Sequence, residues 1–301
     1  MKIPIIFLGT GQAIPTAKRN HTSILLSYKS ENILVDCGEG TQRQFRKLAL
    51  NPCRLTKLLI THWHGDHILG IPGLLQTLAL NRYNRKLEIY GPRGTEFFIK
   101  KILEMFVFQE KIKYEIKEIS SGKFLDNKDF YLEALPMKHG APCLAYSFVE
   151  KEKIRINKKK LEKLKLKGKI IGELAKGKDI IWQGKKILTN KIIYKQPGKK
   201  ITFIFDTAIN PNAYLIAKDS DLLICESTFL ANSDNGKKLA EEYKHLTAEN
   251  AADIAKKARV KRLILSHLSQ RYENQENLIL QEAKKIFKNT EVAHDLYKIE
   301  I

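Results

Sequence analysis

The sequence predicts an α/β protein made of two halves with a basic insertion between them. In residues 1–150, short β-type runs bounded by Gly, Pro or Asn alternate with loops and helical stretches. The same alternation returns from residue 201. Between the halves, residues 151–200 form a lysine-rich segment with few aromatic residues. This order of elements is typical of an α/β protein interrupted by one insertion.

In the first half, apolar runs predict strands, and apolar residues at helical spacing predict helices. The predicted strands are residues 3–9, 23–28, 32–38, 57–62, 87–91, 130–140 and 143–150. The predicted helices are residues 73–79 and 95–106.

In the second half, residues 201–206 and 221–226 are almost continuously apolar, as expected for strands covered on both faces. A further strand is predicted at 262–267, and an amphipathic helix at 276–287. Residues 247–258 predict a helix, because Thr247 can cap it and its first turn is acidic.

The composition excludes several classes of protein. With 301 residues, 43% of them hydrophobic, the chain can build a sizeable core and is not disordered. No run approaches eighteen apolar residues, and the N-terminal run reads as a first strand and not as a signal peptide. The four cysteines are far apart, which argues against a disulfide framework and a thiolate zinc finger. We therefore expect a cytoplasmic protein without a membrane partner.

Positive charge is concentrated in residues 151–200. The chain has a net charge of +20, and this segment alone holds 18 Lys and Arg against 4 Asp and Glu, a net +14. Concentrated positive charge indicates a polyanionic partner, nucleic acid first and a membrane surface second, although a solvated surface arm has the same composition. We predict one domain over 1–301, with 151–200 as a flexible basic arm that buries little apolar area.

The strongest chemical signal is the run from Thr61 to His67, which follows an apolar strand. It contains His62, His64, Asp66 and His67, although the chain has only eight histidines. Imidazole and carboxylate groups suit Zn²⁺, and less often Fe or Mn. His62 and His64 can point to one ion, while Asp66 and His67 lie past the Gly65 turn and can point to a second.

Two ions need more ligands, and the chain offers them where later strands end. His139, Asp206 and His267 each close an apolar strand. Sites form at the carboxyl edges of strands in α/β sheets, so these side chains are candidate ligands. Asp206 is the best candidate to bridge two ions, because a carboxylate can offer one oxygen to each.

This HxHxDH pattern with later His, Asp and His resembles the metallo-β-lactamase fold superfamily. The resemblance implies an αββα four-layer sandwich with the site at one edge, between the two halves. Other segments resemble one branch of the superfamily, the ribonuclease Z family. They are GTGQAIPTAKRN (9–20), LVDCGEGTQRQ (34–44), THWHGDHILGIPGLL (61–75), ICESTF (224–229), HLTAENAA (245–252) and LILSHLSQRY (263–272).

The ribonuclease Z resemblance implies a zinc-dependent endoribonuclease that removes the 3′ trailer from precursor tRNA and leaves a 3′-hydroxyl. Two zinc ions would activate a shared water, with Asp66 as general base. The resemblance also implies a homodimer in which the arm of one subunit binds tRNA for the site of the other, and no DNA substrate. The family's arm often has a Gly-Pro-rich tip, whereas no proline lies between Pro142 and Pro197 here.

The leaving 3′ oxygen needs a proton, and His245 is the best donor. It is not needed as a ligand, it precedes a predicted helix, and an ordinary imidazole pKa suits proton transfer at neutral pH. Glu226 ends the strand 221–226 and could orient it.

Two other functions remain open. The same metal ligands could serve a hydrolase of a small ester, thioester or lactone, for which the basic segment would have no use. A non-catalytic RNA-binding protein would need the basic segment but not a complete ligand set.

Overall fold

The computed structural model describes residues 2–107, 112–164, 166–168, 170–175 and 177–301. It divides into two compact units. The larger unit, the body, contains the residues up to Asp126 together with Leu132–Phe148 and Lys200–Ile301. The smaller unit, the arm, contains Asn127–Tyr131 and Val149–Lys199.

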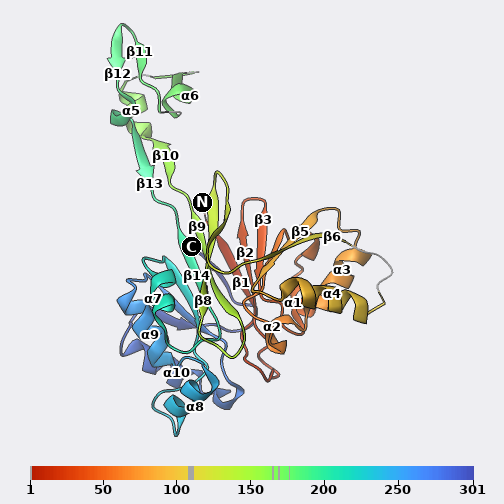
Figure 1. Cartoon of the computed structure of the whole chain (residues 1–301). Helices are drawn as coiled ribbons and strands as arrows, with labels where there is room; N and C mark the ends of the chain where they lie inside the picture. Colours follow the sequence, from red (N-terminus) through yellow and green to blue (C-terminus); the bar gives the residue numbers. More distant parts are fainter. Residues whose placement is uncertain (1, 108–111, 165, 169, 176) are drawn as a thin grey trace. The chain divides into compact units, whose positions relative to one another are not determined.

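The body contains two seven-stranded sheets (Figure 1). The first sheet holds, in spatial order, β18 (Lys298–Glu300), β1 (Pro4–Gly9), β2 (Ser23–Tyr28), β3 (Glu31–Val35), β4 (Lys57–Leu59), β5 (Lys86–Gly91) and β6 (Lys113–Glu118). The second holds β17 (Thr290–Val292), β16 (Leu263–Ser266), β15 (Leu222–Glu226), β14 (Lys200–Ile204), β9 (Cys143–Glu150), β8 (Phe130–Met137) and β7 (Gly122–Asp126). The last strand of the chain therefore pairs with the first.

Helices cover the outer face of each sheet, which gives the four layers of an αββα sandwich (Figure 1). Those beside the first sheet are α1 (Thr41–Lys47), α2 (Gly65–Ile68), α3 (Ile71–Leu80) and α4 (Thr95–Met105), with the 3₁₀ turn η1 (Pro52–Arg54). Those of the second half are α7 (Pro211–Ala217), α8 (Gly236–Tyr243), α9 (Ala248–Lys257) and α10 (Glu276–Lys284), with η3 (Gln270–Tyr272). A buried apolar cluster underlies each set of helices.

The two sheets face each other through aromatic side chains. Tyr28 of β2 packs edge-on against Phe148 of β9, with ring centroids 5.1 Å apart. The hydroxyl of Tyr146, also on β9, donates a hydrogen bond to the carbonyl of Ile60 just after β4. These contacts bring the end of β4 next to the second sheet, where the remaining predicted ligands lie.

Parallel pairing brings the site residues to one edge. Strands β3, β4 and β5 are parallel neighbours, and so are β14, β15 and β16. Carboxyl ends of parallel strands lie at the same edge of a sheet. Several strands end earlier than the sequence predicts: the strand expected to end at residue 206 stops at Ile204, and the one expected to end at 267 stops at Ser266. The site residues that follow leave the extended conformation.

The arm has more structure than its composition suggests. It contains β10 (Lys153–Ile156), α5 (Lys158–Lys163), α6 (Ile170–Ala175), β11 (Ile180–Trp182), β12 (Lys185–Ile187), η2 (Thr189–Lys191) and β13 (Ile193–Gln196). Two antiparallel ribbons form, β10 with β13 and β11 with β12. Leu166, Leu174 and Ile192 are buried in a small cluster, so the expectation of little apolar burial holds only in part. Three lysines of this segment, Lys165, Lys169 and Lys176, lie outside the described residues.

No helix in the described part of the chain is both long and apolar enough to cross a membrane.

Candidate metal centre and proton donor

Three residues of the site have a left-handed backbone. Asp36, Asp206 and His267 have φ angles of 57°, 45° and 57°, and they follow β3, β14 and β16. Non-glycine residues rarely adopt this conformation, and each such residue costs about 1–3 kcal/mol. The turn ends each strand and places the side chain over the edge of its sheet. Such strain at three strand ends indicates a functional site at that edge.

The structure brings all nine predicted site residues together. Two groups of side chains each place their ligand atoms within 4.8 Å of one another, and Asp206 belongs to both. The first group is His62, His64, His139 and Asp206; the second is Asp66, His67, Asp206 and His267. Glu226 and His245 lie beside the second group. This proximity is what the predicted roles require, and the roles themselves stay predictions.

Hydrogen bonds indicate, for three of the imidazoles, which ring nitrogen is left to bind a metal ion. Nδ1 of His67 lies 2.7 Å from the Asp36 carboxylate, so this nitrogen is protonated and donates a hydrogen bond to the carboxylate. Nδ1 of His139 donates to the carbonyl of Lys244 at 3.1 Å. Nδ1 of His267 lies 3.0 Å from the Thr228 hydroxyl. The Thr228 hydroxyl donates to Glu226, so it accepts from Nδ1 of His267. In all three rings the Nε2 lone pair is left facing the site, the arrangement typical of metal-binding histidines.

The free lone pairs face one another across short gaps. Nε2 of His67 and Nε2 of His267 are 3.2 Å apart. Nε2 of His139 and Nδ1 of His64 are 3.1 Å apart. Two lone pairs repel at this distance unless a cation lies between them, so the arrangement fits a bound ion at each group.

Buried polar atoms without partners support the same conclusion. Among the described residues, neither Nε2 of His62 nor Oδ1 of Asp206 has a hydrogen-bond partner. Both side chains are buried. Their nearest polar neighbours are other proposed ligands: Nε2 of His267 lies 3.0 Å from Oδ1 of Asp206, and Oδ2 of Asp206 lies 3.4 Å from Nε2 of His62. A divalent cation would satisfy both atoms. Five imidazoles and two carboxylates in two groups are a donor set that suits Zn²⁺.

His245 and Glu226 form a buried acid–base pair. Nδ1 of His245 lies 3.0 Å from Oε2 of Glu226. The Glu226 carboxylate also accepts hydrogen bonds from the Thr207 amide and the Thr228 hydroxyl, both at 2.6 Å. Burial lowers the pKa of His245, but the carboxylates of Glu226 and Asp206 outweigh burial and raise it to about 9. The contact with Glu226 thus favours the protonated imidazole, where the sequence suggested an ordinary pKa.

Sequence reasoning missed three supporting residues. Asp36 accepts hydrogen bonds from the amide and hydroxyl of Thr61 as well as from His67. Thr228 connects Glu226 to His267. Asp36 ends an apolar strand just as Asp206 does, so the rule that identified Asp206 could have found it. The threonines carry no comparable sequence signal.

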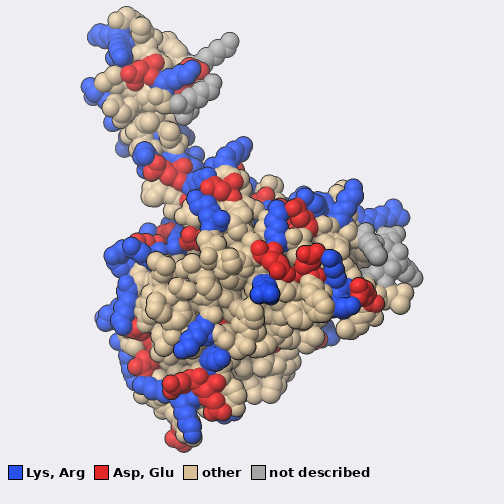
Figure 2. Space-filling model, in the orientation of Figure 1, with Lys and Arg blue, Asp and Glu red and all other residues tan. Residues whose placement is uncertain are grey.

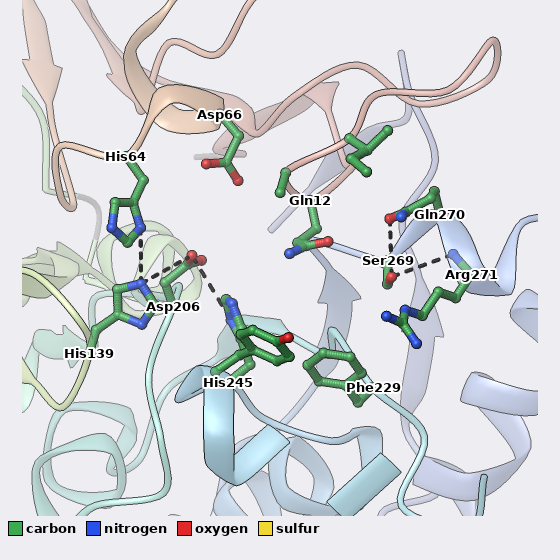
Figure 3. Close-up of a pocket in the computed structure, with 13 residues that line it drawn as sticks. Gln12, His64, Asp66, His139, Asp206, Phe229, His245, Ser269, Gln270 and Arg271 are labelled. Carbon is green, nitrogen blue, oxygen red and sulfur yellow. Dashed lines mark hydrogen bonds and ion pairs between the residues drawn. The ribbon is translucent and has the colours of Figure 1, made fainter. Parts of the chain in front are cut away.

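A cavity of about 290 Å³ opens over these groups. Figure 3 shows His64, Asp66, His139, Asp206 and His245 pointing toward one space from different elements. His64 is exposed and Asp66 is half-buried, whereas His62, His67 and His267 are buried behind them. The cavity is too small for a folded macromolecule, so it admits only the part of a substrate that reacts.

Known proteins resemble this chain in sequence and in fold. A family model described as "Anti-Pycsar protein Apyc1" matches residues 3–154. Over nearly its whole length the chain is similar to the ribonuclease Z of Methanothermobacter thermautotrophicus, with 38% identity over 299 residues that cover 99% of this chain and 96% of the relative.

Two solved structures have a similar fold. Human tRNase Z, short form, matches with a TM-score of 0.71 and 28% identity, over 98% of each chain. The metallo-β-lactamase fold protein YhfI from Bacillus subtilis matches with a TM-score of 0.70 over 100% of each chain, at 18% identity. The αββα, metallo-β-lactamase-like fold predicted from the sequence is confirmed.

Proposed function

The chain belongs to the ribonuclease Z family and is an endoribonuclease that processes the 3′ end of tRNA, and we propose that it removes the 3′ trailer with two zinc ions. The observation that carries this proposal is the pair of ligand groups that share Asp206. The ligands would be His62, His64 and His139 for one ion, Asp66, His67 and His267 for the other, and Asp206 for both. Two bound zinc ions would lower the pKa of a water at the scissile phosphate and stabilise the charge that develops there.

The chain's own residues would handle the protons. Asp66 is half-buried at the cavity, with Oδ2 3.3 Å from Nε2 of His67, and would accept the proton of the attacking water. As the phosphorus–3′-oxygen bond breaks, Nε2 of His245 would donate a proton to that oxygen, because Nδ1 is held by Glu226. The products are a tRNA with a 3′-hydroxyl and a trailer with a 5′-phosphate.

The arm would supply affinity for tRNA. Lys158, Lys163 and Lys185 are exposed, and none of them has an ion-pair partner among the described residues. Figure 2 shows lysine and arginine side chains over the surface of the arm. Exposed unpaired lysines suit contacts with phosphates, and A-form RNA is recognised mainly through its phosphates and riboses.

We propose further that the protein is a homodimer, as the resemblance implies, and acts in the cytoplasm. All four cysteines are free in the structure, which fits a reducing compartment. Light scattering on the purified protein would measure the oligomeric state, and a monomer under assay conditions would overturn the dimer.

The function is tested by incubating the purified protein with a 3′-extended precursor tRNA and mapping both new ends. We expect one cut, a 3′-hydroxyl on the tRNA, two zinc ions per chain by elemental analysis, and loss of cleavage in chelator. A 3′-phosphate product, or full activity without bound metal, would contradict the proposal.

A further inference from the structure

Tyr243 is a half-exposed aromatic residue on the wall of the catalytic cavity. It ends α8, is 53% exposed, and lines the same cavity as His64, Asp66 and His245. One face of its ring rests on Phe229, which is only 4% exposed, with centroids 6.5 Å apart and planes 24° apart. The ring is thus supported from one side and open on the other, the form of a stacking platform.

The backbone ties Tyr243 to the reacting groups. Lys244 follows it with a left-handed φ of 57°, and its carbonyl accepts the hydrogen bond from His139 that orients that proposed ligand. His245 comes next, and its amide donates to the carbonyl of Ala240 inside α8. The tyrosine, the support of a ligand and the proton donor therefore lie in three consecutive residues with a fixed turn. The position of the ring is therefore set relative to His139 and His245.

Phe229 contacts both Tyr243 and His245. Its amide donates to the carbonyl of Leu246, and its carbonyl accepts from the amide of Ala248, both just after His245 in the chain. Its ring contacts the imidazole of His245 edge-on, with centroids 6.1 Å apart. Figure 3 shows Phe229 beside His245 at the same cavity.

The chemistry decides which nucleotide lies here. His245 donates its proton to the 3′ oxygen of the nucleotide that becomes the end of the tRNA, so that nucleoside must lie against His245. Its base then lies next to Phe229 and Tyr243. We propose that Tyr243, supported by Phe229, stacks on the base of the last tRNA nucleotide and holds its 3′ oxygen against His245. This inference rests on the proposed function and adds the residue that binds the 5′ side of the cut.

Stacking on an aromatic ring accepts every base, because every base has a π-face. The site should therefore cut after any of the four nucleotides, with a modest preference for purines, which stack more strongly. A pocket that reads hydrogen-bonding edges would instead favour one base strongly.

The test combines enzyme variants with precursors that lack one base. The variants are Tyr243→Ala, Tyr243→Leu and Tyr243→Phe, with Tyr114→Ala as a control for an exposed tyrosine on β6. The substrates are an intact precursor, one abasic at the nucleotide 5′ of the cut, and one abasic 3′ of the cut. For each pair kcat and KM are measured, together with zinc content and Tm.

On the intact precursor, Tyr243→Ala and Tyr243→Leu should lower kcat/KM roughly 10-fold, mainly through KM, whereas Tyr243→Phe and Tyr114→Ala should stay within about twofold. Removing the 5′ base should cost the wild type a similar factor and cost Tyr243→Ala nothing further. Removing the 3′ base should affect wild type and variant equally.

If the loss of kcat/KM caused by Tyr243→Ala and the loss caused by the 5′ abasic site multiply when the two are combined, the ring does not contact that base. This result would overturn the inference. A coupling with the 3′ base would place the ring on the trailer and also overturn it. If Tyr243→Ala loses zinc or fails to fold, Tyr243→Leu, which keeps an apolar contact with Phe229, carries the test. Wild-type protein that leaves the intact precursor uncut would overturn the proposed function itself, whereas normal cleavage by all variants would overturn this inference alone.

Discussion

The catalytic edge of the body and the surface of the arm use charge in opposite ways. At the catalytic edge, Asp206, His67 and His267 are at most 2% exposed, and hydrogen bonds fix the orientation of both rings. On the arm, Lys158 and Lys163 are exposed and have no ion-pair partner among the described residues. Catalysis needs fixed groups in a site that excludes water, whereas binding to a polyanion depends mainly on the number of charges. The difference supports the proposal that the body carries the chemistry and the arm supplies affinity for tRNA.

The two regions are also stabilised to different extents. Apolar residues of the body form extensive clusters beneath the helices of each sheet. The described residues of the arm form one such cluster, with Leu166, Leu174 and Ile192 as its buried members. Substitutions on the arm should therefore change substrate affinity without disturbing the metal centre, and substitutions in the site should do the reverse.

The largest effect should follow from Asp206→Ala, which removes the residue shared by both ligand groups. We expect loss of bound zinc and a fall in precursor cleavage of roughly 10⁴-fold or more, since groups that act as one unit fail together. Elemental analysis and single-turnover cleavage measure both. Asp219→Ala is the matched control, because Asp219 is also a left-handed aspartate of the body but pairs with Arg259 at the surface. If the Asp206→Ala variant keeps its zinc and its activity, Asp206 is not a ligand and the proposed site is wrong on this point.

His245→Ala should separate proton transfer from metal binding. The cleavage rate should fall roughly 10²–10⁴-fold, the range for losing a general acid, while zinc content stays near that of the wild type. Asp66→Ala should lower both. His294→Ala provides a control, because that ring contacts only the Asp295 carbonyl and Tyr297 among the described residues. If His245→Ala strips the metal yet keeps the rate per bound ion, the donor and ligand roles are exchanged.

Asp36→Asn tests the support behind one ligand. The carboxylate accepts a hydrogen bond from Nδ1 of His67, so the Nε2 lone pair of that ring stays directed at the site. An amide could present its NH₂ group to Nδ1 and reverse the tautomer. We expect zinc affinity to fall roughly 10–100-fold, measured by competition with a chromophoric chelator. Asp295→Asn changes a half-buried carboxylate outside the ligand groups, bonded to Thr10 and Asn20, and should leave zinc affinity unchanged. Equal losses would indicate general destabilisation.

Local rules allow the sequence to predict which residues the fold brings together, while their roles stay predictions. The histidine run is a chemical pattern within seven residues, and His139, Asp206 and His267 each close an apolar strand. Because β3 and β4 are parallel neighbours, as are β14, β15 and β16, the residues that follow them meet at one edge. The predicted strands run too long at Asp206 and His267, since the left-handed turn that aims each side chain is not visible in apolar periodicity.

Other features depend on contacts between distant residues. The pairing of β18 with β1 joins the two ends of the chain, and no local pattern indicates it. Thr228 matters because its hydroxyl lies between Glu226 and His267, a geometry that exists only after folding. In the sequence of the arm, the few apolar residues are scattered among many lysines, so no apolar pattern predicts a core. These residues come together only when the ribbons pair. Short helices such as α7 and α8 were missed for lack of a long periodic run.

Replacing the segment from Glu152 to Gln196 with a short Gly/Ser linker should raise KM for precursor tRNA roughly tenfold at moderate salt and flatten its salt dependence. Hydrolysis of bis(p-nitrophenyl) phosphate, which needs no contact with the arm, should be almost unchanged. Steady-state kinetics over a salt series measures both. Equal losses on the two substrates would mean that the segment supports the catalytic fold.

The smallest effect should come from removing two unpaired charges. Lys158→Gln with Lys159→Gln changes exposed residues at the start of α5, and neither lysine has an ion-pair partner among the described residues. If both contact phosphates, KM should rise about two- to threefold, and the slope of log KM against log salt should fall by about 0.9 for each lost contact. Lys178→Gln is the control, because Glu173 lies 3.2 Å from Lys178 and already offsets its charge. The control should therefore change the slope less than either unpaired lysine does. An unchanged slope in the double variant, with the linker replacement still raising KM, would mean that the arm binds tRNA through its shape and other side chains rather than through these charges.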